Sequence, residues 1–533
     1  MKRLLTVLAL VAALSAASSA EDKVDRERLR KALPLPTVQP QGWYYSVSLD
    51  GRVWEPGQEP AKADVEVLRA RIKDDGSDAQ GWMDLAAAYR RRGDATQQSD
   101  CIGHAVDVLR VRAANRADDG EPLAALGLSL AAAGDDRAAD DAVARAEKAA
   151  QRAWAGTAAS ANLLVLRSIA KAAGQRFGTI DEAGEWIEAD RSRAARVDVA
   201  SIDTASKRLD DAVAALETGS IRGRGAAAVH LARMSVLALR DGCSPRGEAM
   251  ADRRRRLDDA ARDHRKALEL LAPDPLALTM LALDDAMTAP PDIGGNRHAQ
   301  TFDKLDQAAR AKLGESVAKL RSIATSAEPA TSARALQGLA CLQWFVLDNN
   351  SASEARLREA IARDPGVRGS WTALAFVLYG LKRWDDLAKH YDEWIAKSDA
   401  SDQRTIVALH GMAAAALAAG GRLAESEQQS RAALALDPKS PAANISVASL
   451  VLRRTTSQAE VTEAARLLTE ANAELSAQGS EANPSMVAAC FLAVAVGQAL
   501  SDDLDACEKT VRFLLEKFGD IPQAREVLAA IGR

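Results

Sequence analysis

Residues Trp371 to Trp394 read WTALAFVLYGLKRWDDLAKHYDEW, and this stretch decides the fold. Large apolar side chains recur at three- and four-residue spacing before Gly380, and the same spacing resumes after it. This is the pattern of two amphipathic helices joined by a short turn. Small residues such as Ala375 stand among the large ones and let two helices approach within about 8 to 10 Å. The stretch therefore predicts one antiparallel pair of helices.

The helix pair recurs along the chain at a fixed interval. Four positions of an earlier pair return 34 residues later, where Gln337, Ala340, Cys341 and Trp344 become Trp371, Leu374, Ala375 and Leu378. Units begin near residues 334, 368, 407, 441 and 487, and the step from 407 to 441 is again 34 residues. A 34-residue period built from two helices resembles the tetratricopeptide repeat. The opening W-x2-L-G-x2-Y of that family is similar to Trp82, Leu85, Ala86 and Tyr89, with Ala in place of Gly.

The resemblance implies an all-α fold, an α-solenoid of antiparallel helix pairs wound into a right-handed superhelix with a concave groove. Four parts are expected: a signal peptide at 1–20, an extension with a possible β-hairpin at 21–62, partly divergent helical repeats at 63–290, and a regular array at 291–533. Three capping boxes are predicted at helix starts: Thr179 with Glu182 in the divergent part, and Ser351 with Glu354 and Ser457 with Glu460 in the regular array.

The first twenty residues predict export. Lys2 and Arg3 precede an apolar run from Leu4 to Leu14, and Ser18-Ser19-Ala20 supplies the small residues that a signal peptidase needs. We therefore expect a periplasmic or secreted protein. No Cys lies near the cleavage point, so a lipoprotein anchor is not expected. No later stretch stays apolar for the roughly 20 residues of a membrane span.

The charge and the cysteines narrow the classes of partner and site. The chain of 533 residues has 69 basic and 74 acidic residues, a net charge of −5, which becomes −7 without Lys2 and Arg3. An acidic chain disfavours nucleic acid as the general partner. The five cysteines are odd in number and lack C-x-x-C spacing, so neither a disulfide framework nor a zinc site is expected. Cys341 occupies a repeat position that requires a small residue, so it is expected to pack in the core. Cys490 and Cys507 lie on the two helices of one unit, and a disulfide between them stays an open alternative.

An aromatic segment, GWYYSVSLDGRVWEPG, precedes the repeats. Alternation around Trp43 to Leu49 predicts a short strand, and Asp50-Gly51 predicts a hairpin turn before Trp54. Two interpretations stay open for this element. It either covers the end of the first helices or offers an aromatic surface to a glycan or an edge strand to a partner.

Catalytic and ligand-binding patterns are missing from the sequence. It contains no GxSxG, no HExxH, no P-loop and no EF-hand loop, and no two of its six histidines have ligand spacing on one helix. We therefore expect no catalytic residue, no cofactor and no metal. The run Arg253 to Arg256 invites an anion-binding interpretation, but Asp252, Asp258, Asp259 and Asp263 surround it and favour a solvated helix face with ion pairs.

The groove that the resemblance implies would be mostly apolar. Projected onto this sequence, its partner-binding residues are Leu342, Phe345, Phe376, Tyr379, Leu452 and Arg453. Gly338, Ala408, Gly411, Ile445 and Ser449 are expected on the same surface. Family members that clamp a carboxylate use Lys and Asn there, and neither type is present. An amphipathic helix or an extended apolar segment is the better ligand. In the alternative, tight coiling closes the groove and these residues simply pack.

The leading hypothesis is a non-catalytic scaffold of the bacterial envelope that binds a protein or peptide partner through this groove. Nucleic acid and a membrane span are not expected. Self-association into a homo-oligomer is the second hypothesis. The third is an enzyme or glycan-binding protein that uses the aromatic element from Trp43 to Trp54.

Overall fold

The computed structural model describes residues 24–36, 46–47, 53–54, 65–188, 191–219, 221–243, 249–286, 302–400, 402–478 and 483–533. The predicted leader and the predicted boundary near residue 290 lie outside them. Contacts between residues divide the chain into two compact units. The N-terminal unit is Gln41–Ala373, and the C-terminal unit joins Met1–Pro40 to Leu374–Arg533, so that their boundary falls inside α17, Arg368–Gly380.

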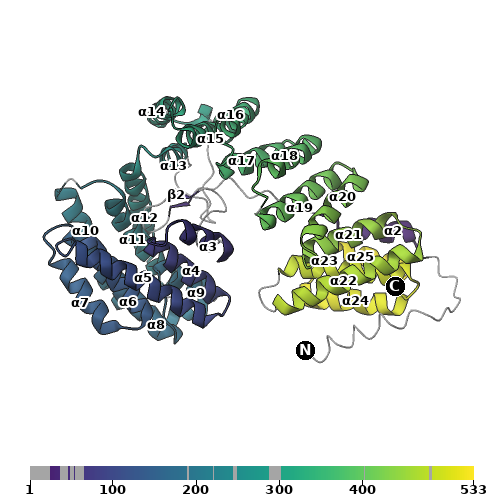
Figure 1. The fold of residues 1–533 in the computed structure, drawn as a ribbon, viewed down its shortest axis with the longest axis horizontal. Helices are drawn as coiled ribbons and strands as arrows, with labels where there is room; N and C mark the ends of the chain where they lie inside the picture. The colour runs from purple at the N-terminus through teal and green to yellow at the C-terminus, as the bar shows by residue number, and fades with distance from the viewer. Residues whose placement is uncertain are drawn as a thin grey trace. The chain divides into compact units, whose positions relative to one another are not determined.

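The N-terminal unit is a succession of antiparallel helices (Figure 1). Its α-helices before α17 are α3 (Val65–Asp74), α4 (Ala79–Arg91), α5 (Ala95–Asn115), α6 (Gly120–Ala133), α7 (Asp136–Glu147), α8 (Ala153–Ala173), α9 (Ile180–Glu188), α10 (Val199–Thr218), α11 (Arg224–Gly242), α12 (Met250–Leu271), α13 (Pro275–Ala286), α14 (Gln307–Ala324), α15 (Pro329–Phe345) and α16 (Asn350–Arg363). Short 3-10 helices, η2 (Arg191–Arg196) and η3 (Phe302–Lys304), lie between them. Neighbours pack in pairs, α4 with α5, α6 with α7, α11 with α12 and α15 with α16. In the predicted divergent part, α8 packs on α10, with α9 and η2 inserted between them in sequence.

The C-terminal unit continues the helix pairs and adds one helix from the start of the chain. Its elements after α17 are α18 (Trp384–Lys397), α19 (Gln403–Ala419), α20 (Leu423–Leu436), α21 (Pro441–Arg454), α22 (Gln458–Gln478), α23 (Pro484–Leu500), α24 (Leu504–Phe518) and α25 (Pro522–Ala530). The pairs are α19 with α20, α21 with α22 and α23 with α24. The added helix, α2 (Arg26–Ala32), packs on α21, α23 and α25.

Equivalent repeat positions make equivalent hydrogen bonds. Trp82 and Trp371 each donate from indole Nε1 to the carbonyl six residues earlier, at 3.0 Å. Asn444, at the corresponding position of a later unit, donates from Nδ2 to the carbonyl six residues earlier, at 3.1 Å. Ser353 and Ser426, buried in second helices, each donate to a carbonyl of the first helix of the pair. The repeat thus fixes polar contacts as well as apolar packing.

The predicted helix starts have different outcomes. Glu182 N donates to Thr179 Oγ1 and Thr179 N donates to Glu182 Oε2, so the capping box at α9 is confirmed. The one predicted at Ser351 is wrong, because α16 begins two residues earlier than that box requires, and Asn349 Oδ1 accepts from Ala352 N at 3.1 Å. The amide side chain of Asn349 thus caps the helix two positions before Ser351. The box predicted at Ser457 is also wrong, because Ser457 N donates to Thr455 Oγ1 at 2.9 Å instead of to Glu460.

Most of the predicted aromatic element lies outside the described residues. The described pieces are β1 (Ser46–Val47) and β2 (Val53–Trp54), which pair antiparallel with Ser46 opposite Trp54. Four residues do not establish the predicted hairpin, and its role as a cover or a binding surface stays a prediction.

Candidate functional site

Helix α2 is a short amphipathic helix that docks within the C-terminal unit. Asp25 caps its start by accepting from Arg28 N at 3.0 Å. Leu29, Ala32 and Leu33 fall on one face at helical spacing and are 0%, 4% and 3% exposed. Seven residues form too short a helix to persist in water alone, so the contacts of this face hold it.

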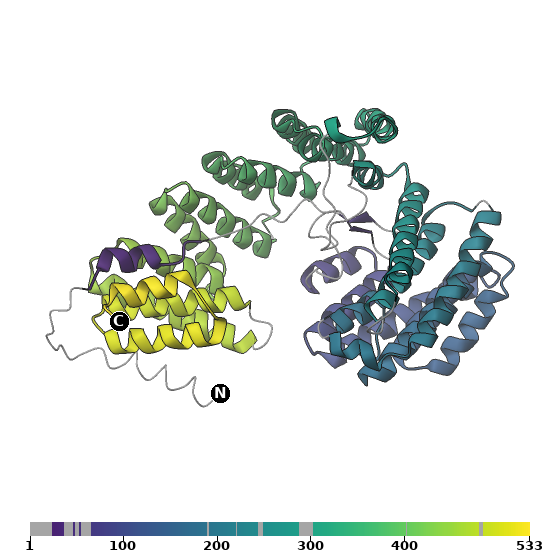
Figure 2. The ribbon, with the colours of Figure 1, turned by 180° about the vertical axis from the view of Figure 1, so that it is seen from behind.

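The surface that receives α2 is an apolar face of three helices, and we call it the α2 site. Leu29, Ala32 and Leu33 belong to one buried apolar cluster with residues of α21, α23 and α25, among them Ile445, Leu452, Val496, Val527 and Ala530. Figures 1 and 2 show α2, in purple, against these green and yellow helices from both sides. Burial of the apolar face is therefore the main attraction.

Backbone carbonyls and guanidinium groups set the register of α2 in its site. At its start, Asp25 N donates to the carbonyl of Ala530 at 2.9 Å. At its end, Arg453 Nη2 donates to the carbonyls of Lys31 and Leu33 at 3.2 and 2.8 Å. The last carbonyls of a helix lack partners within the helix and carry the negative end of its dipole, so a cation is stabilising there. Burial lowers the pKa of Arg453 from its ordinary value.

Three arginines of α2 point at acceptors of the receiving helices. Arg30 Nη2 donates to the carbonyl of Thr455 at 2.7 Å. Arg26 pairs with Asp502 at 3.0 Å and Arg28 with Glu526 at 2.6 Å. The Arg26 and Arg28 pairs are largely exposed, so they contribute orientation and charge preference more than stability.

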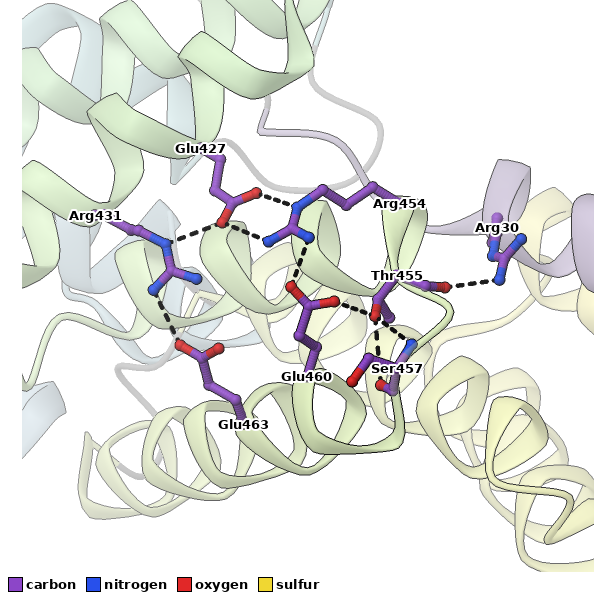
Figure 3. Close-up of polar contacts among 8 residues, drawn as sticks. All are labelled: Arg30, Glu427, Arg431, Arg454, Thr455, Ser457, Glu460 and Glu463. Atoms are coloured by element: carbon purple, nitrogen blue, oxygen red, sulfur yellow. Dashed lines mark hydrogen bonds and ion pairs between the residues drawn. The ribbon is translucent and has the colours of Figure 1, made fainter.

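A network of charged side chains holds the end of α21 at Arg454 and the adjoining Thr455 (Figure 3). Its centre is Glu427 of α20, whose carboxylate accepts from Arg454 Nε at 2.8 Å and from Arg431 Nε at 2.9 Å. The carboxylate of Glu427 is only 11% exposed. Hydrogen bonds from Arg454, more than those from Arg431, hold the pKa of Glu427 below its ordinary value.

The same network extends to α22 and to α2. Arg454 Nη1 also donates to Glu460 at 2.6 Å, and the other oxygen of Glu460 accepts from the hydroxyl of Thr455. The Thr455 side chain is thereby fixed while its carbonyl accepts from Arg30. The charges of three repeat helices thus position one acceptor for α2, as Figure 3 shows.

The predicted groove residues of α15 lie in the interior of the N-terminal unit. Leu342 is 1% exposed and shares a cluster with residues of α13 and α14, and Phe345 packs against that cluster while half-buried. Gly338 is also covered, because a Cβ on it would lie 2.1 Å from Thr279 Oγ1. The preceding helices α13 and α14 thus occupy the face of α15 expected to line a groove.

The predicted groove residues of α17 and α19 are more accessible. Phe376 and Tyr379 are half-buried, and the Tyr379 ring meets that of Trp384 edge-on at 5.4 Å. Ala408 is exposed, and a Cβ on Gly411 would meet no atom of the described residues within 4 Å. In this part of the C-terminal unit, small and aromatic residues form a face that is exposed or half-buried.

The predicted residues of α21, Leu452 and Arg453, lie beneath α2. Leu452 is 1% exposed within the cluster that includes Leu29, and Arg453 donates to the end of α2. Ile445 and Ser449, expected on the same face, are likewise buried. The amphipathic segment on this face is the chain's own. Sequence reasoning did not predict that this segment docks here, although the spacing of Leu29, Ala32 and Leu33 was a usable signal of an apolar face.

The other candidates for chemistry have structural explanations. Arg254 pairs with Asp258 and Arg255 with Asp252, as the ion-pair interpretation predicted. Arg253 and Arg256 instead share Asp241 of α11, and Asp259 pairs with Arg262. Asp263, which was expected to pair with the run, accepts from buried His230 at 2.9 Å and from Arg233 at 2.8 Å.

The described part of the chain has neither a metal-binding cluster nor a membrane-spanning helix. No cluster of three His, Cys, Asp or Glu side chains there is placed to hold a metal ion. None of its helices has the length and apolarity needed to cross a bilayer. All five cysteines are free and buried, so Cys490 and Cys507 do not pair.

The chain is similar to known proteins only at the level of solved structures. Neither the family models nor the curated proteins include a match to the chain. Similar solved structures include yeast Tom70, at 13% identity and a TM-score of 0.33, with 88% of this chain and 91% of that chain covered. The APC/C hetero-tetramer Cut9-Hcn1 has 13% identity and a TM-score of 0.27, with 88% and 90% covered. The TPR domain of P58(IPK) has 12% identity and a TM-score of 0.23, with 88% and 92% covered.

At these scores the three structures add nothing about a partner, so the fold rests on the chain itself. Its evidence is the 34-residue period, the antiparallel helix pairs and the hydrogen bonds that recur at Trp82, Trp371 and Asn444. The described part of the chain is therefore an α-solenoid built from antiparallel helix pairs, and its 34-residue period resembles that of the tetratricopeptide repeat.

Proposed function

We propose that this protein is a non-catalytic scaffold whose C-terminal unit binds helical segments of other proteins. The observation that carries the proposal is α2, an amphipathic helix that packs on α21, α23 and α25. A surface that holds one such helix through an apolar floor and carbonyl acceptors has the chemistry to hold another.

The accessible face around Tyr379 extends the proposed binding surface. Phe376 and Tyr379 supply half-buried rings, and Ala408 and Gly411 leave space in front of α19. Aromatic side chains are favoured anchors in interfaces because they bury large areas at small entropic cost. A partner helix would place apolar side chains against this face.

We further propose that the scaffold works in the bacterial envelope. The support is the leader predicted at residues 1–20, with its basic start, apolar run and small residues before the cleavage point. Peptide sequencing of the exported protein tests this, since a mature chain that begins near Glu21 is expected. Recovery of the uncleaved chain from the cytoplasm would reject the envelope location.

Site-specific crosslinking tests the binding surface. A photoreactive residue at position 379 is expected to trap a partner in native envelopes, and the same residue at Lys389, exposed on α18, is expected to trap none. In a pull-down from the same envelopes without a crosslinker, Tyr379→Glu should reduce recovery of the trapped partner at least about tenfold, because a carboxylate must be desolvated at the contact. Equal recovery of the partner by folded Tyr379→Glu and by wild type would reject this surface.

A further inference from the structure

Resting on the proposed scaffold function, we infer that the α2 site recognises a basic amphipathic helix of a partner, and that α2 occupies this site as an internal competitor until displaced. The partner helix has an apolar face spaced like Leu29, Ala32 and Leu33, with arginine or lysine beside that face. The inference comes from four features of the docked helix.

The first feature is that α2 depends on its site. A helix of seven residues, Arg26–Ala32, lies below the roughly 12 to 15 residues that an isolated helix needs in water. Docking and helix formation are therefore coupled, and undocking returns α2 to a disordered chain. A longer partner helix brings more of its own helical stability and loses less entropy on binding.

The second feature is the charge of the acceptors. Asp502, Glu526 and the carbonyl of Thr455 all receive guanidinium groups of α2. These acceptors select a cationic flank, and an acidic helix would face two carboxylates instead. The net negative charge of the mature chain also favours binding of a basic helix.

The third feature is the cation at the far end. Arg453 meets the carbonyl end of the bound helix, so the site fixes helix direction as well as charge. A partner helix in the same direction would place its own last carbonyls, or a following acidic side chain, on this guanidinium. A reversed helix would present free N–H groups to a cation.

The fourth feature is that α2 fits its site imperfectly. Buried Arg453 Nε and Ser449 Oγ have no hydrogen-bond partner among the described residues, and the same holds for Arg30 Nε of α2 itself. Each such group is desolvated without compensation. A partner that offers acceptors to Arg453 and Ser449 therefore has an advantage over α2.

Tethering makes α2 an effective competitor despite this fit. An intramolecular ligand acts at a high effective concentration, so a free helix binds only to chains whose site is empty. The apparent dissociation constant rises by the inverse of that empty fraction. Weakening α2 must then strengthen binding in trans, which is the signature of an internal competitor.

The test uses the mature full-length chain and a fluorescent peptide of residues 24–36, with anisotropy as the measurement. Leu29→Glu in the chain removes the apolar anchor and frees the site, and Leu33→Ala is the milder second variant should Leu29→Glu fail to fold. Glu27→Ala is the matched control, because Glu27 is an exposed residue of α2 that pairs only with Lys31 of the same helix among the residues described. A peptide with Leu29→Glu controls for nonspecific binding.

We expect the peptide to bind the Leu29→Glu chain at least about tenfold more tightly than wild type or Glu27→Ala, which corresponds to an empty fraction of about one in ten or less. Binding of the peptide to none of these chains, or to all equally, would overturn the inference. Light scattering of the wild type identifies exchange of α2 between two copies, and a dimer that the Leu29→Glu chain loses would make the occupant a second copy and reject an external partner. Failure here leaves crosslinking at position 379 unaffected, so the two proposals fail separately.

Discussion

Arg453 Nη2 lies 2.8 Å from the carbonyl oxygen of Leu33, so a residue expected to touch a partner caps a helix from the other end of the chain. The contact joins a charged donor to the free end of α2. Arg453 was predicted to line the groove, and in the structure it binds the chain's own helix α2.

Arg453→Met should loosen α2 without unfolding the rest of the C-terminal unit. The variant keeps the apolar stem and removes the donor to two carbonyls, and hydrogen bonds to charged groups contribute about 1.5–3 kcal/mol. Hydrogen exchange of residues 26–33 is expected to accelerate about tenfold or more, while exchange in α22 stays unchanged. Arg466→Met is the control, since Arg466 pairs with Glu470 on the exposed surface of α22. Unchanged protection of α2 would contradict the assigned cap.

Glu427→Gln should destabilise the C-terminal unit by about 1–2 kcal/mol, because it weakens hydrogen bonds to Arg454 and Arg431. The estimate is modest because the two guanidinium groups are 47% and 40% exposed. Urea unfolding measures the change, with Glu470→Gln as the exposed control. An effect no larger than that of the control would mean that the network in Figure 3 adds nothing to stability.

The difference in stability between wild type and Glu427→Gln should shrink in acid. Arg454 lowers the pKa of Glu427 from its ordinary value of 4.5. A lowered carboxyl pKa stabilises the fold above the unfolded value, and this contribution is lost as pH falls through the folded value. Urea titrations from pH 7 to pH 3 should show a constant difference down to about pH 5 and a smaller one below. A difference that grows in acid would have the wrong sign.

Gly338→Ala should destabilise the N-terminal unit by about 1–3 kcal/mol, since the added methyl group meets a filled space. The new Cβ would lie 2.1 Å from Oγ1 of Thr279, which is fully buried. Gly411→Ala is the matched comparison in the C-terminal unit, and there a helix-interior glycine in open space gives a gain of about 0.5–1 kcal/mol. Thermal unfolding of both variants checks the pair. Tolerance of alanine at 338 would mean that α13 and α15 are not in close contact there.

Cys490 and Cys507 should resist alkylation in the folded protein. Burial raises the pKa of each thiol to about 12, and the thiolate is the reactive form. Iodoacetamide at pH 8 followed by intact mass is expected to show no fast labelling until guanidinium is added, when all five cysteines react. Rapid labelling of the native chain, or a mass that indicates a disulfide, would contradict this.

The fold could be predicted because it depends on residues close together in sequence. The site could be predicted only in part, because it depends on contacts between residues far apart in sequence. The spacing of apolar residues around Trp371 predicts a helix pair by itself, because the residues that form the pair lie within a few helical turns of one another. The face of α21 with Leu452 and Arg453 was also expected to receive an amphipathic segment. The identity of that segment did not follow from the sequence. Leu29 indicates that α2 has an apolar face, but the sequence does not indicate which of many apolar surfaces covers that face. The resemblance placed Leu342 in a groove, but α13 and α14 pack on that face of α15 and bury it.

The separation of Arg26 and Asp502 by 476 positions has a consequence for biogenesis. When the chain emerges N-terminus first, α2 is made long before the helices that will hold it. α2 stays unstructured while nearly all of the repeats are synthesised. Its docking closes a very long loop, and this step therefore comes late in folding. During this interval α2 is open to chaperones and proteases, so its final docking reports that the last repeats have been completed.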